Sequence, residues 1–403
     1  MAAGSILLYH VWMYGSPGGP EELGYLSRFV LPHLPVGVTL FFTLSAYLLY
    51  RPIASALLQE RPPQDVRRYL RRRALRIFPA YWVILAAVAV VVPAALTSTE
   101  ELGRLVEDPA TLLANAALLQ NHFPRSLDTG ILPAWSLAVE VGFYLALPLL
   151  GLLAAVCYRR ARATSGRILA LLAPALAMTI LGAAAKAAGE WLFAPDSGVA
   201  HDVLVRHFLS YADLFAPGMA LAVAHASIVH FSVRLPRWWG VVVAGSLGTT
   251  VVTVVALYDR NLLWRWGLTN PYQRLTGLAC VLLLALVVLP QTDPTHRTFL
   301  VRTLEWRPLI AIGVASYSLF LWHEPVVRHL QARGWTSGGT VGFLSNLVVV
   351  AVISGALAAL TYSCVERPAL RRRSVKVSDA TGGPQSSLAH AGAVQRQHSE
   401  ASL

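Results

Sequence analysis

The sequence has few charged residues for its length. Only 13% of its 403 residues are Asp, Glu, Lys or Arg, about half of the roughly 25% expected of a soluble globular domain. Hydrophobic residues make up 55% of the chain, and the mean hydropathy is +0.54. This composition excludes an ordinary soluble protein, a disordered chain and a coiled coil as descriptions of the whole. It is typical of a polytopic membrane protein.

Cysteine is also scarce. Cys157, Cys280 and Cys364 each lie in or at the edge of an apolar run and do not have the spacing of metal ligands. We therefore expect neither a disulfide framework nor a metal site, and we interpret the cysteines as small packing residues. The net charge of +12 does not indicate nucleic-acid binding, because the basic residues lie between apolar runs rather than on one polar face.

Apolar runs long enough to cross a bilayer, about 20 residues each, predict an all-α bundle of about ten transmembrane helices. Two of the ten runs are weaker than the rest: the opening run, 1–14, and the run near 208–226. The stretch 108–120 is too short to cross, so we interpret it as an interfacial or re-entrant helix. The eight clear runs lie near 32–50, 79–97, 134–157, 167–188, 239–257, 274–290, 308–328 and 341–364.

The distribution of basic residues orients these helices. If the chain starts inside, 23 of the 33 Lys and Arg residues fall in connections and a tail that face the cytoplasm, and 10 fall on the outer side. The positive-inside rule requires such an asymmetry, and counting 108–120 as a further span would reverse every later connection. We therefore predict a multi-pass protein of the cell membrane with both termini cytoplasmic.

Two parts of the chain differ in composition: a membrane domain, 1–368, and a basic tail, 369–403. The tail is polar and without apolar periodicity, so we expect it to be disordered and cytoplasmic. The opening run has 14 residues, which as a helix reach about 21 Å against a hydrocarbon core of about 30 Å. We therefore expect the native start of the protein to lie upstream of Met1.

Polar and ionisable residues inside the spans are few, and each is a functional candidate because its burial in lipid is costly. His10 is either the polar end of a short span or a functional imidazole. Glu140 either holds a basic residue structurally or titrates during function. A serine such as Ser45 is most often a packing residue whose hydroxyl forms a hydrogen bond within its own helix. His323 stands two residues before Pro325, so it either marks a helix end or belongs to a site.

The basic segment 67–82 also has two interpretations. Most of its arginines are expected to anchor the inner membrane face. Arg73 and Arg76 are three residues apart, so on a helix that continues into the third span they share one face, just before Pro79. Two guanidinium groups at the inner mouth of a bundle suit the phosphates of an anionic co-substrate.

Six short motifs follow one another along the chain: YH, FFTLSAYLL, RALRIFPAYW, WSLAVEVGFYL, SYSLFLWHEP and VERP. Their order and wording over residues 1–368 resemble the acyltransferase-3 family of integral-membrane O-acyltransferases. The resemblance implies acyl-CoA, above all acetyl-CoA, as a co-substrate on the cytoplasmic side, with no bound cofactor. It also implies an acceptor hydroxyl on a carbohydrate, an envelope polymer or a glycosylated metabolite.

The resemblance assigns roles to single residues. His10 matches the first-span histidine of the family, a candidate general base, and Arg73 and Arg76 match its paired arginines. Glu140 matches the carboxylate of its fourth-span motif, and His323 matches the histidine of its ninth-span motif. We therefore expect His10, Glu140 and His323 to be catalytic, and the two arginines to bind the donor.

Three further residues come from the same motifs. Ser45, Trp135 and Ser136 are expected either to contact substrate or to support the site. The family usually has glycine after the second-span serine, where this chain has Ala46. It also usually carries an arginine about three turns before the first-span histidine, which would precede Met1 here.

Acyl transfer from a thioester to a hydroxyl needs a base near the alcohol, a donor site and stabilisation of the oxyanion. We assign the base to His10, with Glu140 orienting either that imidazole or one of the arginines. Direct transfer is favoured, because no cysteine or serine has a histidine at recognisable spacing, with a covalent acyl-histidine as the alternative. A secondary transporter or permease would also show ten spans, but this chain has no evident repeated halves. A scaffold that recruits partners through its basic tail is a third class.

The predicted topology can be tested with reporters. A reporter fused after residue 373 or within 60–66 should be cytoplasmic, because those segments carry the arginine excess. Tags at 18–20 and 335–339 should be accessible from outside intact cells. An external tail would show that 108–120 crosses the membrane.

Overall fold

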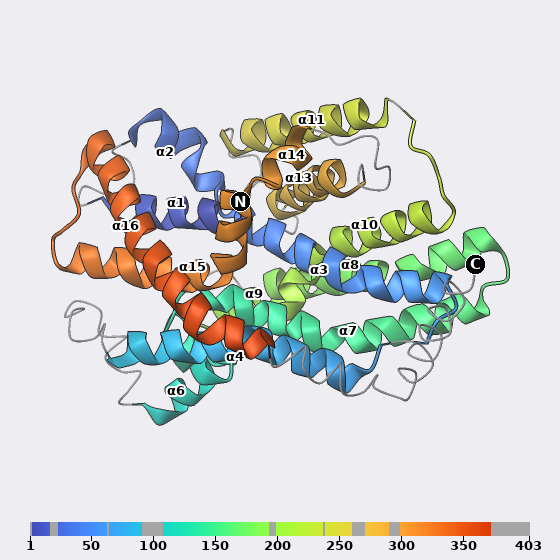
Figure 1. Ribbon diagram of the computed structural model, residues 1–403, viewed down its shortest axis with the longest axis horizontal. Coiled ribbons are helices and arrows are strands. Elements are labelled where there is room, and N and C mark those ends of the chain that lie inside the picture. The colour runs from blue at the N-terminus through green and yellow to red at the C-terminus, as the bar shows by residue number, and fades with distance from the viewer. Residues whose placement is uncertain are drawn as a thin grey trace, which may run out of the picture.

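Helices and their connections make up the whole of the part that the computed structural model describes, which comprises residues 2–16, 23–62, 64–90, 108–192, 199–236, 238–259, 271–289 and 299–371; no strand occurs there. Figure 1 shows a bundle elongated along its main helices. The predicted all-α membrane bundle is confirmed. The predicted tail, 369–403, lies almost wholly outside the described residues.

The helix bounds follow the apolar runs. The α-helices are α1 (Ala2–Tyr14), α2 (Tyr25–Phe29), α3 (Val36–Leu58), α4 (Val66–Val90), α6 (Pro109–Ala116), α7 (Ala134–Arg160), α8 (Thr164–Leu192), α9 (Val199–Arg206), α10 (Ala212–His230), α11 (Trp239–Asp259), α13 (Pro271–Val288), α14 (Phe299–Leu304), α15 (Arg307–Ala332) and α16 (Gly339–Thr361). Short 3₁₀ turns cover Leu31–His33, Gln120–His122, Pro124–Ser126 and Phe208–Tyr211, and a π-helical turn covers Tyr362–Glu366.

Eight of the described helical segments are long and apolar enough to cross a membrane. They correspond to seven of the eight clear runs and to the weaker run near 208–226. The other clear run forms α13, 18 residues long, and the opening run forms α1, 13 residues long. The stretch 108–120 contains only the eight-residue α6, which is too short to cross, as expected.

Charged residues and prolines interrupt the apolar runs of the sequence, but the helices continue through them. α4 begins at Val66, thirteen residues before the predicted span, and continues through Pro79. The arginines of the basic segment are therefore helical, as the spacing argument required, while 91–97 lies outside the described residues. α15 continues through Pro325 to Ala332, so the interpretation of His323 as a helix-end residue is wrong. Transmembrane bundles tolerate proline because neighbouring groups satisfy the freed carbonyl.

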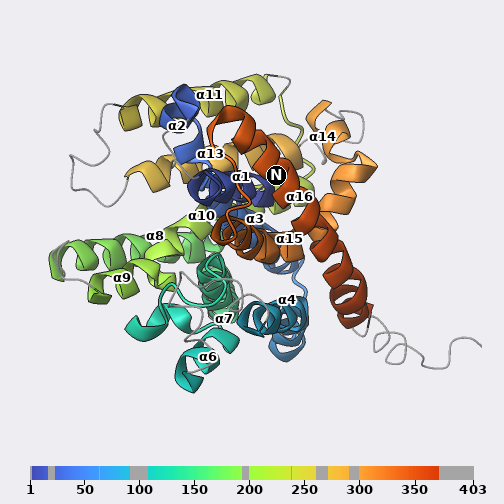
Figure 2. The ribbon, with the colours of Figure 1, turned by 90° about the vertical axis from the view of Figure 1, so that its left-hand side faces the viewer.

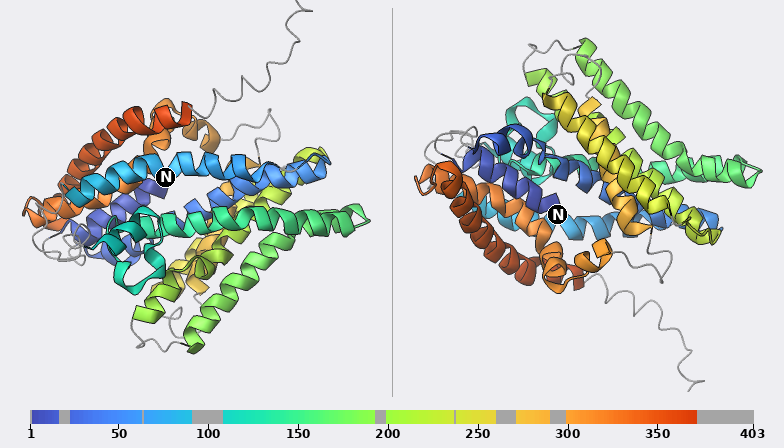
Figure 3. Two further views of the ribbon diagram at one scale, coloured as in Figure 1. Left: turned by 90° about the horizontal axis from the view of Figure 1, so that it is seen from below. Right: turned by 90° about the horizontal axis from the view of Figure 1, so that it is seen from above.

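The helix that carries His10 lies inside the bundle. Viewed from one end, α1, α3 and α15 occupy the middle, with α11 and α13 on one side and α4 and α7 on the other (Figure 2). Seen from below, α4 and α7 run along one face, and seen from above, α11 crosses the opposite face (Figure 3). α1 packs against α3, α15 and α16. A residue on α1 can therefore meet residues from the end of the chain.

The most extensive helix contact joins α3 and α10. At Gly218 a Cβ would lie 2.0 Å from the carbonyl oxygen of Thr43 and 3.0 Å from the Cβ of Ala46. The ring of Phe42 stacks 4.8 Å from that of Phe215 one turn away. Small residues allow helices to approach this closely in a membrane. The missing glycine at Ala46 does not prevent the approach, because Gly218 supplies the space from the opposite helix.

A buried ion pair joins α8 and α10. Lys186 Nζ lies 2.8 Å from both carboxylate oxygens of Asp213, and both side chains are nearly inaccessible. A Cβ on Gly182 would lie 2.5 Å from the Asp213 backbone nitrogen, so the two helices are in direct backbone contact here. The pairing explains how the run near 208–226 accommodates a carboxylate, since a charge in lipid needs a partner.

The α3–α10 contact generates a stability prediction. Gly218→Val should sharply lower the melting temperature and the yield of monodisperse protein in detergent, because the new side chain meets the Thr43 backbone rather than a movable side-chain end. Gly245→Val is the matched control, since nothing lies within 4 Å of a Cβ there. Equal melting temperatures for both variants would contradict the packing argument.

Candidate active site

His10 and His323 are direct partners. Nδ1 of His10 lies 2.7 Å from Nε2 of His323, and the ring planes are 18° apart with centroids separated by 4.9 Å. Two rings in face-to-face contact cannot bring nitrogens so close, so the two imidazoles hydrogen-bond edge to edge. His323 is fully buried, whereas His10 is half-buried. The structure therefore unites two candidates that lie 313 residues apart in the chain.

The hydrogen bonds fix the tautomers. Nδ1 of His323 lies 3.2 Å from the carbonyl oxygen of Leu319, and a carbonyl can only accept, so this nitrogen carries the proton. Nε2 of neutral His323 is then an acceptor, and Nδ1–H of His10 donates to it. This leaves Nε2 of His10 with a lone pair. The arrangement is that of a base whose orientation a second residue holds.

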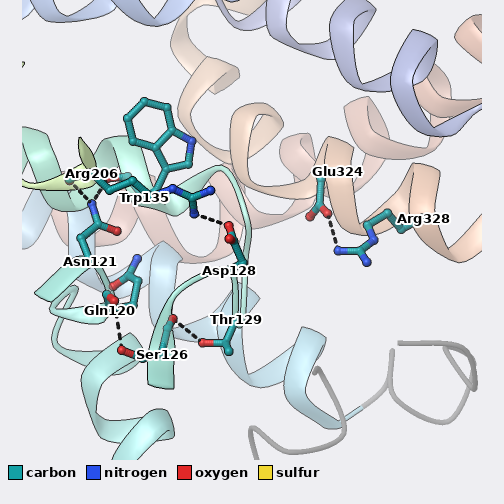
Figure 4. Close-up of polar contacts among 9 residues, drawn as sticks. All are labelled: Gln120, Asn121, Ser126, Asp128, Thr129, Trp135, Arg206, Glu324 and Arg328. Atoms are coloured by element: carbon teal, nitrogen blue, oxygen red, sulfur yellow. Dashed lines mark hydrogen bonds and ion pairs between the residues drawn. The ribbon is translucent and has the colours of Figure 1, made fainter. Parts of the chain in front are cut away.

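Charged and aromatic groups surround this pair on the side where α1 ends. Arg328 Nη1 lies 3.3 Å from Glu324 Oε1, one turn along α15 (Figure 4), and its guanidinium carbon lies 5.6 Å from the centre of the Tyr14 ring. The Tyr14 ring in turn lies 5.8 Å from that of His10. Glu324 is buried, so Arg328 compensates a carboxylate that would otherwise be costly.

A second group of polar side chains joins α3, α4 and α7. The Ser45 hydroxyl donates to Glu140 Oε1 at 2.6 Å, and the Tyr144 hydroxyl donates to the same oxygen. Arg73 lies over the Tyr144 ring, with its guanidinium carbon 5.5 Å from the ring centre. Ser45 thus bonds across to α7 rather than to its own helix. Glu140 is held by hydroxyl groups beside an arginine, and its described hydrogen bonds do not go to His10.

Arg76 belongs to an adjoining ion pair. Its Nη1 lies 3.8 Å from Glu366 Oε2, and the Ser318 hydroxyl donates to the other oxygen of that carboxylate. Glu366 is buried, while about a third of the Arg76 side chain is exposed. Arg73 and Arg76 therefore face the bundle, as the spacing predicted, whereas Arg67 and Arg68 are exposed.

Trp135 and Ser136 lie in the first turn of α7. The Ser136 hydroxyl donates to the carbonyl of Pro133 at 2.9 Å, so in this structure it bonds within the first turn of its own helix. The Trp135 ring packs 5.2 Å from that of Tyr211, and its backbone carbonyl accepts from Asn121. Both residues stand at the end of the bundle where the 108–133 connection enters α7.

Sequence reasoning missed several members of these groups. Tyr144 and Arg328 each lie four residues from a buried carboxylate on the same helix, a spacing that could have identified them. Glu366 stands in the VERP motif but was not assigned a role. Ser318 gave no local signal, because its partner is 48 residues away in the chain.

The family of the chain is shown by comparison with known proteins. The acyltransferase-3 model, an acyltransferase domain, matches residues 1–364. The chain belongs to this family. It is therefore an acyltransferase for groups other than aminoacyl groups, built as a multi-pass membrane protein.

Two relatives are informative. Nodulation protein 10 of Rhizobium leguminosarum bv. viciae is 24% identical over 395 residues, which cover 94% of this chain and 93% of the relative. "Putative peptidoglycan O-acetyltransferase YrhL" of Bacillus subtilis (strain 168) is 26% identical over 350 residues, which cover 83% of this chain and 50% of the relative. This chain thus spans about half of the second protein. No solved structure matches the chain.

Proposed function

We propose that the protein moves an acyl group, above all acetyl, from acyl-CoA to a hydroxyl of a carbohydrate, an envelope polymer or a glycosylated metabolite. The observation that carries this proposal is the hydrogen bond between His10 and His323, since it leaves Nε2 of His10 as a free base. The name of one relative, "Putative peptidoglycan O-acetyltransferase YrhL", supports acetyl as the group.

The reaction follows from the tautomers. Nε2 of His10 takes the proton of the acceptor hydroxyl as the oxygen attacks the thioester carbonyl carbon. The tetrahedral intermediate collapses with cleavage of the carbon–sulfur bond, and the imidazolium returns the proton to the leaving thiolate. The products are the ester and free CoA. His323 acts as a positioning residue, because its Nε2 accepts from His10 throughout.

The donor would bind on the side that the charge pattern predicts to be cytoplasmic. Arg73 and Arg76 offer guanidinium groups to the phosphates, and Glu366 keeps Arg76 in place. Ser318, which contacts Glu366, and His323 lie five residues apart on α15, about 8 Å along the helix axis. The acyl end of a donor held by the arginines would thus extend along α15 toward the two histidines.

The role of His10 can be tested by substitution. His10→Ala should lower the rate of acceptor-dependent CoA release from acetyl-CoA by about a hundredfold or more, because general-base catalysis contributes that much. Membrane insertion should be retained, whereas the melting temperature should fall moderately, because the variant leaves Nε2 of the buried His323 without its partner. Wild-type turnover in this variant at saturating substrate would assign the base elsewhere.

The donor site is tested by two pairs of arginines. Arg73→Ala and Arg76→Ala should each raise the KM for acetyl-CoA about tenfold or more, because they remove a guanidinium that faces the bundle. Arg67→Ala and Arg68→Ala are the matched controls on the exposed side of the same helix, and they should change the KM little. Lysine in place of Arg73 or Arg76 should restore the low KM for acetyl-CoA only poorly. An equal rise of the KM in all four variants would indicate that these arginines only anchor the helix at the membrane surface by their charge.

A further inference from the structure

Three polar side chains join α3 and α10, which lie side by side in the bundle (Figure 1). The Tyr47 hydroxyl lies 2.6 Å from Nδ1 of His225, and Nη1 of Arg51 lies 3.3 Å from the same hydroxyl. Ser45, two residues before Tyr47, bonds Glu140 on α7 instead. Residues two apart on a helix point about 200° apart around its axis. The group formed by Arg51, Tyr47 and His225 is therefore separate from the group around Glu140.

The hydrogen bonds of this group determine which nitrogen of His225 carries a proton. An arginine can only donate, so the Tyr47 oxygen accepts from Arg51, and the Tyr47 O–H donates to Nδ1 of His225. Nε2 of the neutral imidazole then carries the proton and is a donor. It has no hydrogen-bond partner among the described residues, and unlike the hydroxyl of Ser227 it is not fully enclosed. His225 is only 6% exposed, so packing holds the ring while one N–H stays available.

Arg51 also has unused donors. A guanidinium group carries five N–H donors, and the bond to Tyr47 is the only hydrogen bond or ion pair that Arg51 forms with the described residues. The helices around it do not compensate its charge. α3 and α13 contain no Asp or Glu, and the one carboxylate of α10, Asp213, pairs with Lys186. The group thus combines a positive charge, several free donors and no acidic partner on these helices.

Arg51 and His225 each lie where an apolar run of the sequence ends. The run 32–50 stops directly before Arg51, although α3 itself continues to Leu58, and the run near 208–226 stops one residue after His225. The distribution of basic residues predicts that this end of the bundle is cytoplasmic. We therefore expect both donors to lie at the depth of the lipid phosphates of that leaflet rather than in the hydrocarbon core.

The class of ligand follows from the charge, the donors and this depth. Phosphate oxygens are strong acceptors, and an arginine binds them through charge-assisted hydrogen bonds. Basic pockets between transmembrane helices at the cytoplasmic side bind anionic lipid headgroups. A zwitterionic headgroup carries a cation close to its phosphate, which Arg51 would repel. The group is thus suited to the phosphate of a lipid with a net negative charge.

We propose that Arg51 and His225, held together by Tyr47, bind the phosphate of an anionic phospholipid headgroup across α3 and α10. Arg51 supplies the charge, and Nε2–H of His225 supplies a directed donor. Because these helices form the most extensive helix contact, a headgroup bound to both would stabilise the folded protein. The site is independent of the proposed acyl transfer, since none of its three residues forms a described hydrogen bond with the proposed base or with Glu140.

The test measures lipid binding to the whole chain purified in detergent. Titration with dioleoylphosphatidylglycerol should give a saturable adduct in native mass spectrometry and a rise in the melting temperature, whereas dioleoylphosphatidylcholine at the same concentration should give neither. Arg51→Gln should weaken phosphatidylglycerol binding about tenfold or more, because it removes the charge and the donors of the guanidinium group. Arg61→Gln is the matched control, since this exposed arginine lies just beyond the end of α3. Its affinity should equal that of the wild type.

Two further variants test the geometry of the site. Arg51→Lys keeps the charge but not the planar set of donors, so it should recover only part of the affinity. His225→Phe keeps a ring but removes the Nε2–H donor, so it should also weaken binding. Equal affinities for Arg51→Gln and Arg61→Gln would show that Arg51 is one basic residue among several at the membrane surface and would overturn the proposal. Wild-type affinity in His225→Phe would overturn the assignment of a site that joins two helices.

A soluble phosphate compound would find the same donors, so CoA serves as the competitor. Phosphatidylglycerol should remain bound when CoA is added, because the lipid site is separate from the proposed donor site. Displacement of the lipid by CoA, together with weaker CoA binding in Arg51→Gln, would assign the group to the soluble co-substrate and overturn the lipid assignment. Lipid binding is measured without turnover. Failure of the protein to release CoA from acetyl-CoA would therefore count against the proposed function and leave the lipid site standing.

Discussion

A polar side chain within a membrane bundle must find a partner in the protein, and this constraint organises the site. His10 bonds His323, Glu140 accepts from Ser45, and Arg76 pairs with Glu366. Each bond joins helices that are distant in the chain, so the same contacts that hold reactive groups also hold the bundle together. A site of this kind is rigid before substrate arrives, which reduces the cost of orienting the reacting groups.

α15 connects the two proposed halves of the reaction. Its Ser318 contacts the carboxylate that pairs with Arg76, and about one and a half turns later its His323 bonds His10, the proposed base. Glu324 and Arg328 then bring the same helix to the 108–133 connection. The groups proposed to bind the donor and to supply the base thus follow one another along a single helix.

The sequence predicted much of the fold and part of the site. The apolar runs located the spans, because hydropathy over about 20 residues is a strong signal. Spacing placed Arg73 and Arg76 on one helix face, and the structure agrees. Helix ends were less predictable: α4 and α15 continue past Pro79 and Pro325, because partners elsewhere in the bundle compensate a proline. The close approach of α3 and α10 was hidden as well, since its glycine lies at position 218.

By itself the sequence determined the class of protein, the spans and the types of reactive residue, because these depend on local composition and spacing. Only the tertiary structure decided which residues act together. It paired His10 with His323 rather than with Glu140, and it paired Arg76 with Glu366. Among the described residues it left the Gln120 side chain without a hydrogen-bond partner. The physical reason is that a hydrogen bond has a reach of about 3 Å, and the partners are separated by up to 313 residues of chain. Helix packing alone brings them within that reach.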